Sequence, residues 1–255
     1  MQRLKEKVAI VTGAAQGNGE GIARALAKEG AIVILTDISD KVYETAKKIQ
    51  ASGYKAIPMR MDVTNFDEVN QTVKKVLERF GRVDILVNNA GIYPHEPLLR
   101  DMMEEFWDKI FKINVKGIFY CTKAVLPGMM ERKSGKIINI SSVTGPMVST
   151  PRSVCYSASK GAVSAFTRGL ALQLAEYGIN VNAVCPGYVD TPGARRALGD
   201  DVDQVAQSIP LKRFGTIDEL GDLVVFLASE ESNYITGTEI VFDGGNIIQE
   251  LKTML

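Results

Sequence analysis

A glycine-rich turn between an apolar run and a helical stretch constrains this chain more than any other feature. Residues 7–12 (KVAIVT) are short, apolar and β-branched, and Gly13, Gly17 and Gly19 follow directly. Residues 20–29 then have a helical pattern. Glycines allow a tight turn and close backbone approach, and a helix N-terminus offers unpaired N–H groups and partial positive charge. The stretch predicts a strand–turn–helix unit suited to a pyrophosphate, with the spacing G-x-x-x-G-x-G.

The same alternation of apolar runs and helical stretches continues along the chain. Further strands are expected at residues 31–36, 55–61, 83–87, 136–140, 179–184 and 238–242. Alternating units of this kind predict a parallel sheet covered on both faces. The predicted fold class is α/β, a single-domain doubly wound Rossmann-type parallel seven-stranded sheet with helices on both faces. A helical pattern over 106–132 is expected to break at Gly117 and at Pro127-Gly128.

No compositional change marks a linker, so we expect one domain over residues 1–255. Its nucleotide-binding elements are expected mainly in residues 7–91, and its catalytic and substrate elements mainly in residues 92–215.

Composition narrows the partners and the compartment. Thirty basic and thirty acidic residues cancel without a long basic run, which favours a small-molecule partner over nucleic acid or a membrane surface. No signal peptide or membrane span is expected. Cys121, Cys155 and Cys185 lack the close spacing of a redox or metal motif, which indicates reduced thiols and a cytoplasmic protein. With His95 as the sole histidine, no metal site is predicted.

Ligands of such sheets bind beyond the carboxyl ends of the strands. Four strand ends supply candidate cofactor contacts: Gly13, Gln16, Gly17, Asn18 and Gly19; Asp37 and Ile38; Asp62 and Val63; and Asn89, Ala90 and Gly91. Asp62 either faces an adenine amino group or caps the helix that begins near Asn65, and the sequence favours neither. Asn88, next to these residues, fits a purely structural turn equally well.

Asp37 bears on the choice of cofactor. It ends the second strand, eighteen residues beyond Gly19, where a carboxylate can accept hydrogen bonds from the adenosine ribose and would repel a 2′-phosphate. No Arg or Lys lies within residues 13–19, and Ile38 and Ser39 follow Asp37. We therefore expect NAD rather than NADP. The alternative is that Asp37 merely begins a turn with Ser39, and the upstream glycine turn favours the ribose interpretation.

The candidate reacting groups lie in the second half of the chain. Tyr156 and Lys160 are four residues apart, so a helix would place them on one face, although this common spacing, taken alone, favours two solvated residues. A nearby ammonium stabilises a phenolate, so we expect the Tyr156 pKa to be pulled towards neutrality. Ser142 follows the strand at 136–140 and can hold a substrate oxygen. Asn114 lies inside a helical pattern, which is unfavourable unless its amide has a function.

Taken together, the motifs resemble a known family. In chain order they are T-G-x-x-x-G-x-G (Thr12–Gly19), N-N-A-G (Asn88–Gly91), a helical asparagine (Asn114), S-S (Ser141-Ser142), Y-x-x-x-K (Tyr156–Lys160) and P-G-x-x-x-T (Pro186–Thr191). This ordered set resembles the short-chain dehydrogenase/reductase family over essentially the whole chain. One departure is Asn18, where the family commonly has an aliphatic residue.

The resemblance implies a role for each candidate. Tyr156 would be the general acid in carbonyl reduction or the base in alcohol oxidation. Lys160 would hold the nicotinamide ribose hydroxyls and lower the Tyr156 pKa, and Ser142 would bind the substrate oxygen. Asn114 would keep a water in a proton relay to Lys160. The resemblance also implies cofactor contacts after the sixth strand, at Pro186, Gly187, Val189 and Thr191, and a homotetramer joined through two long helices and the last strand.

The expected function is NAD(H)-dependent hydride transfer between nicotinamide and a small alcohol, ketone or aldehyde. The alternative is a dinucleotide-binding regulatory protein without catalysis, and the presence of the full Asn, Ser, Tyr, Lys set favours the enzyme. Substrate choice is expected in residues 92–99, 143–154 and 193–213, the last being the predicted mobile lid. Arg152, Arg195 and Arg196 either bind an anionic group or are simply solvated, and the second interpretation is preferred.

Overall fold

A seven-stranded, all-parallel sheet organises the computed structural model, which describes residues 2–249. The strand order is β3-β2-β1-β4-β5-β6-β7. The strands are β1 (Val8–Thr12), β2 (Ile32–Asp37), β3 (Ala56–Arg60), β4 (Ile85–Asn88), β5 (Gly135–Ile140), β6 (Ile179–Pro186) and β7 (Glu239–Phe242). The predicted fold class is confirmed. Met1 and residues 250–255, which belong to the predicted domain 1–255, lie outside the described residues.

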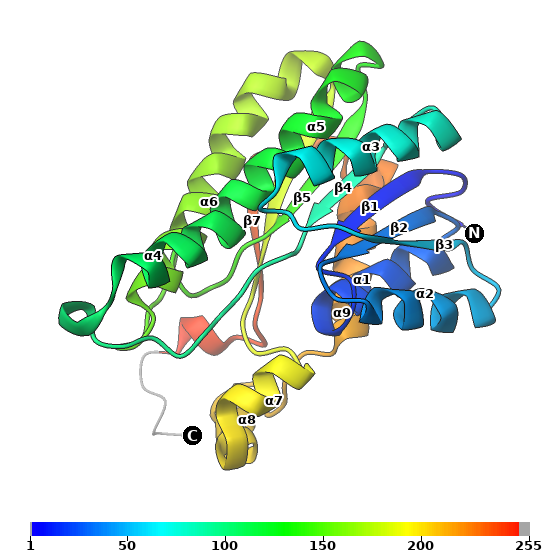
Figure 1. Cartoon of the computed structure of the whole chain (residues 1–255). Coiled ribbons are helices and arrows are strands. Elements are labelled where there is room, and N and C mark those ends of the chain that lie inside the picture. The colour runs from blue at the N-terminus through cyan, green and yellow to red at the C-terminus, as the bar shows by residue number, and fades with distance from the viewer. Residues whose placement is uncertain (1, 250–255) are drawn as a thin grey trace.

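Helices cover both faces of the sheet (Figure 1). The longer helices are α1 (Gly17–Lys28), α2 (Lys41–Ala51), α3 (Phe66–Phe80), α4 (Glu104–Phe111), α5 (Gly117–Glu131), α6 (Val154–Leu174) and α9 (Ile217–Ala228). Side chains of β1 alternate between the two layers: Ala9 and Val11 pack with α1, α2 and α9, whereas Val8 and Ile10 pack with α3, α5 and α6. This period of two is what buries a parallel strand on both faces.

The packing of α1 against α9 depends on two glycines. A Cβ atom at Gly21 would lie 2.4 Å from the Ile217 carbonyl oxygen, and one at Gly221 would lie 2.7 Å from the Ala25 Cβ. The two helix backbones therefore approach more closely than larger side chains allow. This contact fixes the first helix, which begins at the glycine turn, against the body of the molecule.

The helical pattern over 106–132 behaves differently from the prediction. Neither Gly117 nor Pro127 breaks it, because α4 runs through the π-helical segment η2 (Lys112–Lys116) into α5, which contains Pro127. Pro127 has no N–H group, so the Lys123 carbonyl lacks its usual donor in the helix. Both residues lie on the exposed side of the helix, where water can satisfy that carbonyl. The irregularity lies instead at η2, around Asn114.

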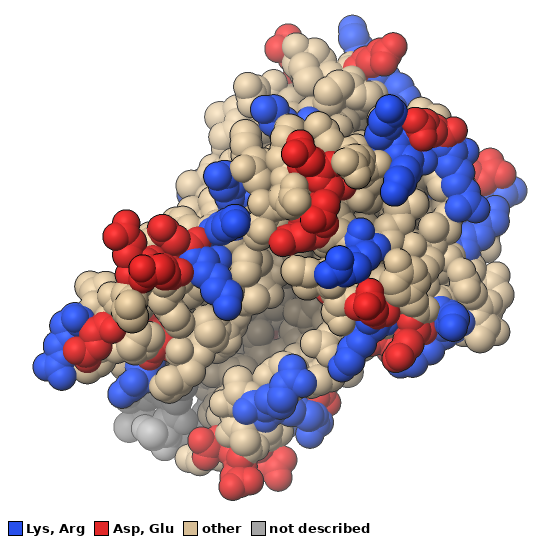
Figure 2. Space-filling model, in the orientation of Figure 1, with Lys and Arg blue, Asp and Glu red and all other residues tan. Residues whose placement is uncertain are grey.

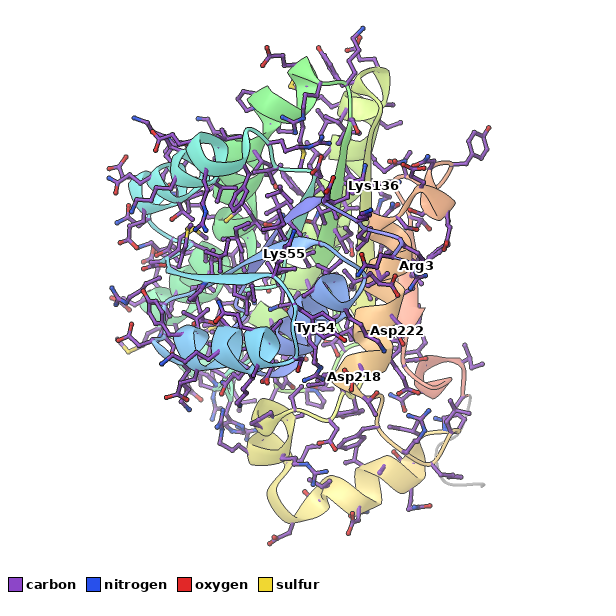
Figure 3. All side chains as sticks on the ribbon, turned by 90° about the vertical axis from the view of Figure 1, so that its right-hand side faces the viewer. Arg3, Tyr54, Lys55, Lys136, Asp218 and Asp222 are labelled. Carbon is purple, nitrogen blue, oxygen red and sulfur yellow. The ribbon has the colours of Figure 1, made fainter. Side chains whose placement is uncertain are left out.

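Two short helices, α7 (Pro192–Leu198) and α8 (Val202–Ser208), project beyond the sheet (Figure 1). Figure 3 shows Lys136, near the start of β5, at the opposite end of the molecule from this α7–α8 pair. The pair therefore lies at the carboxyl ends of the strands. Among residues 2–249, no helix combines the length and apolar character that crossing a membrane requires.

Candidate active site

The glycine turn forms a cradle that no other residue type fits. Gly13 and Gly17 have φ angles of 65° and 62°. A Cβ atom at Gly19 would lie 2.1 Å from the Gly13 carbonyl oxygen, and one at Gly13 would lie 2.8 Å from the Ala90 Cα. The N-cap residue of α1, Gln16, makes no side-chain capping bond, so the first-turn N–H groups of the helix have no cap from that side chain. This geometry suits an anionic group such as a pyrophosphate.

Thr12 and Asn89 fasten the cradle to β4. The Asn89 and Ala90 backbone N–H groups each donate to Thr12 Oγ1 at 3.0 Å. Asn89 Nδ2 donates to the carbonyl oxygens of Thr12 (2.8 Å) and Gly13 (3.0 Å). The turn after β1 and the turn after β4 are thus one hydrogen-bonded unit. The sequence analysis did not predict a role for Thr12, although its position at the start of the glycine motif could have indicated one.

Asp37 forms the turn that the sequence allowed and also bonds to the glycine cradle, whereas its contact with a ribose stays a prediction. Its Oδ1 accepts from the Ser39 N–H at 2.9 Å, which is the predicted turn, and its Oδ2 accepts from the Ala15 N–H of the glycine cradle at 3.0 Å. Each carboxylate oxygen retains a free lone pair for a further donor. The carboxylate is therefore held at the edge of the cradle, where a ribose bound to the same cradle would meet it.

Arg60 lies opposite Asp37 in the register of β2 and β3, and the sequence analysis did not anticipate it. Its Nε donates to the Ile38 carbonyl oxygen at 3.1 Å, and it lies 3.7 Å from the Asp40 carboxylate. The residues next to Asp37 in sequence offered no obvious cation to neutralise a 2′-phosphate, but Arg60 is a cation that lies nearby. Strand pairing brings Arg60 there, and the local sequence around Asp37 holds no signal for it.

The capping alternative for Asp62 is also wrong. Asp62 Oδ1 accepts from the Thr64 N–H at 2.8 Å, whereas α3 is capped by Asn65, whose side chain accepts from the Asp67 and Glu68 N–H groups. Asp62 thus shapes the turn after β3 and leaves the helix cap to its neighbour. Its proposed contact with adenine stays a prediction.

Asn88 has a structural role in a buried polar chain. Its Nδ2 donates to Asn139 Oδ1 at 2.9 Å and to Thr122 Oγ1 at 3.2 Å, and Asn139 Nδ2 donates to Thr167 Oγ1 at 2.9 Å. These bonds join the ends of β4 and β5 to α5 and α6. The network helps to fix the register of the two strands that carry the site, although the buried Asn88 Oδ1 has no hydrogen-bond partner among the described residues.

Asn114 has the function that its position in a helix requires. It is fully buried in the π-helical segment η2. Its Oδ1 accepts from the Ile92 N–H at 2.9 Å, and its Nδ2 donates to the Ile92 carbonyl oxygen and to Ser159 Oγ, both at 3.1 Å. Ser159 Oγ in turn donates to the Tyr156 carbonyl oxygen at 2.7 Å. Asn114 therefore links the segment after β4 to the first turns of α6.

Tyr156, Lys160 and Ser142 come together at the start of α6. Lys160 Nζ lies 5.7 Å from the centroid of the Tyr156 ring and donates to the Ile140 carbonyl oxygen at 2.8 Å. Ser142 Oγ donates to the Pro186 carbonyl oxygen at 3.4 Å and lies close enough to the Tyr156 phenol to lower its pKa. Ser142 Oγ also accepts from the Thr144 N–H at 3.1 Å. A phenol, a hydroxymethyl group and an ammonium thus share one end of the site.

The pKa of Tyr156 differs from the prediction. Burial raises it to about 12, and the nearby Ser142 hydroxyl lowers it by less than burial raises it. Burial also lowers the pKa of Lys160 to about 8, since the residue is only 5% exposed. Desolvation disfavours both charged forms, so the expected lowering of the Tyr156 pKa by the ammonium is wrong for this structure. The phenol is held as a proton donor.

Aromatic rings form a wall beside the phenol. The Tyr93 and Tyr156 rings meet edge-on, with centroids 4.6 Å apart and an interplanar angle of 67°. Tyr188 stacks on Phe214 at 5.5 Å, and burial raises its pKa. Figure 2 shows the surface hollowed between the α7–α8 pair and the body of the molecule, with mostly uncharged side chains in the hollow.

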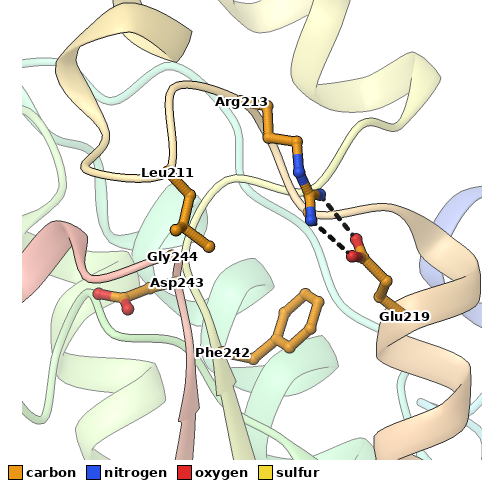
Figure 4. Close-up of a pocket in the computed structure, with 7 residues that line it drawn as sticks. Leu211, Arg213, Glu219, Phe242, Asp243 and Gly244 are labelled. Atoms are coloured by element: carbon orange, nitrogen blue, oxygen red, sulfur yellow. Dashed lines mark hydrogen bonds and ion pairs between the residues drawn. The ribbon is translucent and has the colours of Figure 1, made fainter.

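Ion pairs hold both ends of the predicted lid. Arg195 donates to both carboxylate oxygens of Asp190 at 2.6 and 2.7 Å, so it is paired, not simply solvated. Arg213 donates to both oxygens of Glu219 at 2.9 and 2.7 Å (Figure 4). Arg213 and a capping bond from Thr216 lower the pKa of Glu219 to about 2. The pair lines a small pocket with Leu211, Gly215, Phe242, Asp243 and Gly244. The lid's mobility stays a prediction.

The residues after β6 close the cradle from the other side. Thr191 Oγ1 accepts from the Ala194 N–H at 3.1 Å and caps α7, and a Cβ atom at Gly17 would lie 3.4 Å from the Thr191 Cβ. Gly187 donates its N–H to the Phe242 carbonyl oxygen at 2.9 Å. Thr191 therefore lies beside the glycine turn, whereas Gly187 is bonded to the end of β7.

The cradle fits a dinucleotide in one further respect. Asn18 Oδ1 is buried and has no hydrogen-bond partner among the described residues, although it lies in the first turn of α1. A buried polar atom without a partner is costly, and a ligand amide or hydroxyl would satisfy it. The described part of the chain groups no three His, Cys, Asp or Glu side chains in a way that would hold a metal ion.

Comparisons with known proteins agree with this geometry. A family model described as enoyl-(acyl carrier protein) reductase matches residues 13–246, which include the cradle and all four candidate reacting residues. The chain belongs to the short-chain dehydrogenase/reductase family. Members of this family bind a nicotinamide dinucleotide, and the chain is accordingly an oxidoreductase of the nicotinamide hydride-transfer type.

Individual relatives in the short-chain dehydrogenase/reductase family cover nearly the whole chain. The oxidoreductase UcpA of Salmonella typhimurium is 46% identical over 258 residues, 98% of each chain. The 3-oxoacyl-[acyl-carrier-protein] reductase FabG of Thermotoga maritima is 41% identical, over 96% of this chain and all of its own. A solved structure of an actinorhodin polyketide ketoreductase variant with NADPH is 35% identical, with a TM-score of 0.90 over 96% of this chain and 99% of its own.

Proposed function

We propose that this chain transfers hydride between NAD(H) and a small alcohol or carbonyl compound, with Tyr156 as general acid or base. One observation carries the proposal. The Tyr156 phenol lies close enough to Ser142 for that hydroxyl to lower its pKa, and it lies beside Lys160, on the strand-end edge that also holds the glycine cradle. In this proposal residues 7–91 mainly bind the nucleotide, and residues 92–215 mainly supply catalysis and substrate binding.

Each side chain has a defined task in the proposed reaction. The cofactor, when bound, supplies or accepts the hydride. Tyr156 donates its phenolic proton to the substrate oxygen in reduction and takes that proton back in oxidation, and its raised pKa keeps the donor protonated near neutral pH. Ser142 Oγ donates to the same substrate oxygen and stabilises its developing charge. Lys160 holds the ribose hydroxyls and replaces the proton that Tyr156 gives up.

Asn114 supports this relay from the side. Both of its amide N–H groups donate to Ile92 and Ser159, and Ser159 donates to the Tyr156 carbonyl, so Asn114 acts on Tyr156 through the backbone of α6. The π-helical turn around Asn114 interrupts the regular helical hydrogen bonds. A backbone carbonyl freed in this way supports the proposed water beside Lys160.

The choice of NAD rests on Asp37. Its carboxylate is fixed by two backbone N–H groups, and a 2′-phosphate on the adjacent ribose would meet a full negative charge. Two observations oppose this choice. Arg60 lies next to Asp37, and the related ketoreductase structure contains NADPH. Arg60 already donates to the Ile38 carbonyl and pairs with Asp40, so we weigh Asp37 more heavily.

A second candidate substrate class comes from the similarity to FabG. At 41% identity over the full length, this relative favours reduction of a 3-oxoacyl group carried on a protein. The Tyr93–Tyr156 and Tyr188–Phe214 pairs offer apolar ring faces that suit either an acyl chain or a small ketone. The two candidates differ in substrate length, and the same reacting residues serve both.

A spectrophotometric screen tests the proposal. Purified chain is mixed with NADH or NAD, and absorbance is followed against panels of ketones, aldehydes, sugars, polyols, hydroxy acids and 3-oxoacyl thioesters. We expect turnover with at least one small carbonyl or alcohol, and stronger turnover with the thioesters would support the FabG-like reaction. No turnover on any panel, despite measurable NADH binding, would favour the dinucleotide-binding regulator.

Assembly and compartment belong to the same proposal. Met103 and Phe119 on the α4–α5 side, Leu172 on α6 and Val241 on β7 are exposed apolar side chains, which supports burial between subunits of a homotetramer. A monomer by light scattering would contradict it. The three buried free cysteines are consistent with a reducing cytoplasm, as proposed.

A further inference from the structure

A buried carboxylate caps the helix that carries Tyr156. Glu96 is 1% exposed, and it lies on the chain between β4 and the 3-10 helix η1 (Leu99–Asp101). Its Oε2 accepts from the Cys155 N–H at 2.9 Å, and its Oε1 accepts from the Tyr156 N–H at 2.7 Å. No cation pairs with Glu96 within residues 2–249. These two backbone groups are its hydrogen-bond partners.

Those N–H groups need a partner from outside the helix. Helix α6 begins at Val154, so Cys155 and Tyr156 lie in its first turn, where N–H groups have no intrahelical acceptor. The N-cap residue Ser153 makes no capping bond, because its hydroxyl donates to the Thr150 carbonyl oxygen. Glu96 supplies the cap from 59 and 60 residues away, and its charge also favours the positive end of the helix.

We propose that Glu96 is a positioning residue for Tyr156: its carboxylate fixes the first turn of α6, and therefore the phenol, to the segment between Ile92 and Glu96. The inference rests on the proposed function of Tyr156 as acid or base. Truncating this side chain lets the first turn move, although Glu96 itself touches no reacting atom. A displacement of about 1 Å in such a group costs on the order of 100-fold in rate.

The segment 92–96 is fastened at both ends, which makes this coupling direct. At one end Asn114 binds the Ile92 N–H and carbonyl, and at the other Glu96 binds α6. Between them, the Tyr93 ring packs edge-on against Tyr156. The Tyr93 ring and the Tyr156 phenol are therefore held in place by the same segment. A change in residues 92–96 should move both side chains.

The test compares Glu96→Ala, Glu96→Gln and wild type by three readouts: kcat on a substrate found in the screen, NADH dissociation constant by fluorescence, and amide hydrogen exchange. We expect Glu96→Ala to lower kcat by about 100-fold with little change in NADH affinity. The Cys155 and Tyr156 amides should exchange about 10- to 100-fold faster, the factor that a lost charge-assisted hydrogen bond gives. Amides in the middle of α6 should keep their protection.

Glu96→Gln is the conservative variant, because it keeps the volume and one acceptor oxygen. We expect it to restore part of kcat and part of the amide protection, and it serves as the test if the alanine variant does not fold. The matched control is Asp84→Asn. Asp84 is also buried and accepts a backbone N–H, from Val8 at 2.8 Å, but it lies beside Lys136 at the other end of the sheet (Figure 3).

The control separates a loss of stability from a loss of position. Asp84→Asn should lower the melting temperature and leave kcat and the exchange of the Cys155 and Tyr156 amides unchanged. Wild-type kcat in folded Glu96→Ala, or unchanged exchange at the two amides, would overturn the inference. If wild type is inactive on every panel, the proposed function of Tyr156 fails, and the exchange data alone then decide whether Glu96 positions the helix.

Discussion

The two halves of the strand-end edge are built on different principles. Around β1, β2 and β4, backbone groups and glycines shape the cradle, and side chains such as Thr12 and Asn89 bond mainly to backbone atoms. Around β5 and α6, the shape comes from side chains whose pKa values are shifted by desolvation, such as the half-buried Tyr156 and the buried Lys160. The first half fixes where a ligand lies, and the second fixes the protonation of the groups that would react with it.

Removing the phenolic oxygen is the sharpest way to separate the halves. Tyr156→Phe should lower kcat by about 10²- to 10⁴-fold, the usual contribution of general acid–base catalysis. NADH affinity should stay nearly unchanged, because the cradle does not depend on the hydroxyl. Steady-state kinetic assays measure kcat, and fluorescence titration measures NADH affinity. Wild-type turnover by this variant on a proven substrate would remove Tyr156 from the mechanism.

A methyl group in the cradle should have the complementary effect. In Gly19→Ala the new Cβ would lie 2.1 Å from the Gly13 carbonyl oxygen, so the turn must shift, and we expect kcat/KM to fall about 100-fold through weaker NADH binding. Gly169→Ala is the matched control, because a Cβ there meets nothing within 4 Å. It should leave NADH binding unchanged and stabilise α6 by about 0.5–1 kcal/mol. Equal NADH affinity in both variants would contradict the cradle.

Asp37, at the edge of the cradle, should set the preference for NADH over NADPH, and changing it should have a smaller effect than the two substitutions above. Asp37→Ala should narrow the ratio of kcat/KM for NADH over NADPH by about 10- to 100-fold, because a charged acceptor for the ribose is lost. Arg60→Ala should act in the opposite direction by weakening NADPH use. Parallel kinetics with the two cofactors measure both ratios. A wild type that prefers NADPH would refute the assignment of NAD.

The smallest expected effect is a pH dependence of stability. The pKa of Lys160 falls to about 8 on burial, so between pH 8 and its ordinary value of 10.5 the unfolded chain binds the extra proton and the folded chain does not. Relative to Lys160→Met, wild type should gain on the order of 2 kcal/mol of unfolding free energy from pH 8 to about pH 10.

Urea denaturation of wild type and Lys160→Met across this range measures the slope. Lys136→Met is a useful companion, since burial also lowers the Lys136 pKa to about 8 at the opposite end of the sheet. The same sign is expected there without any loss of turnover. A difference between wild type and Lys160→Met that does not change with pH would show that Lys160 stays charged in the folded chain.

The comparison also explains what the sequence could predict. The seven strands and the glycine turn follow from local patterns, so their positions were within reach of periodicity and turn chemistry. Arg60 and Glu96 were missed because strand pairing and a long-range cap bring them to the site, and no local pattern marks either. The helix break predicted at Pro127 is absent. Pro127 lies on the exposed side of the helix, where water can replace the hydrogen bond that the proline removes. The Tyr156 pKa was mispredicted because burial outweighs a nearby ammonium.

A crystal structure of the chain with bound NADH tests the central claim most directly. The account predicts that C4 of the nicotinamide ring faces the Tyr156 and Ser142 hydroxyls, leaving room for a carbonyl carbon about 3.5 Å from C4 with its oxygen between them. A nicotinamide ring bound away from both hydroxyls, with the adenosine still at Asp37, would contradict it.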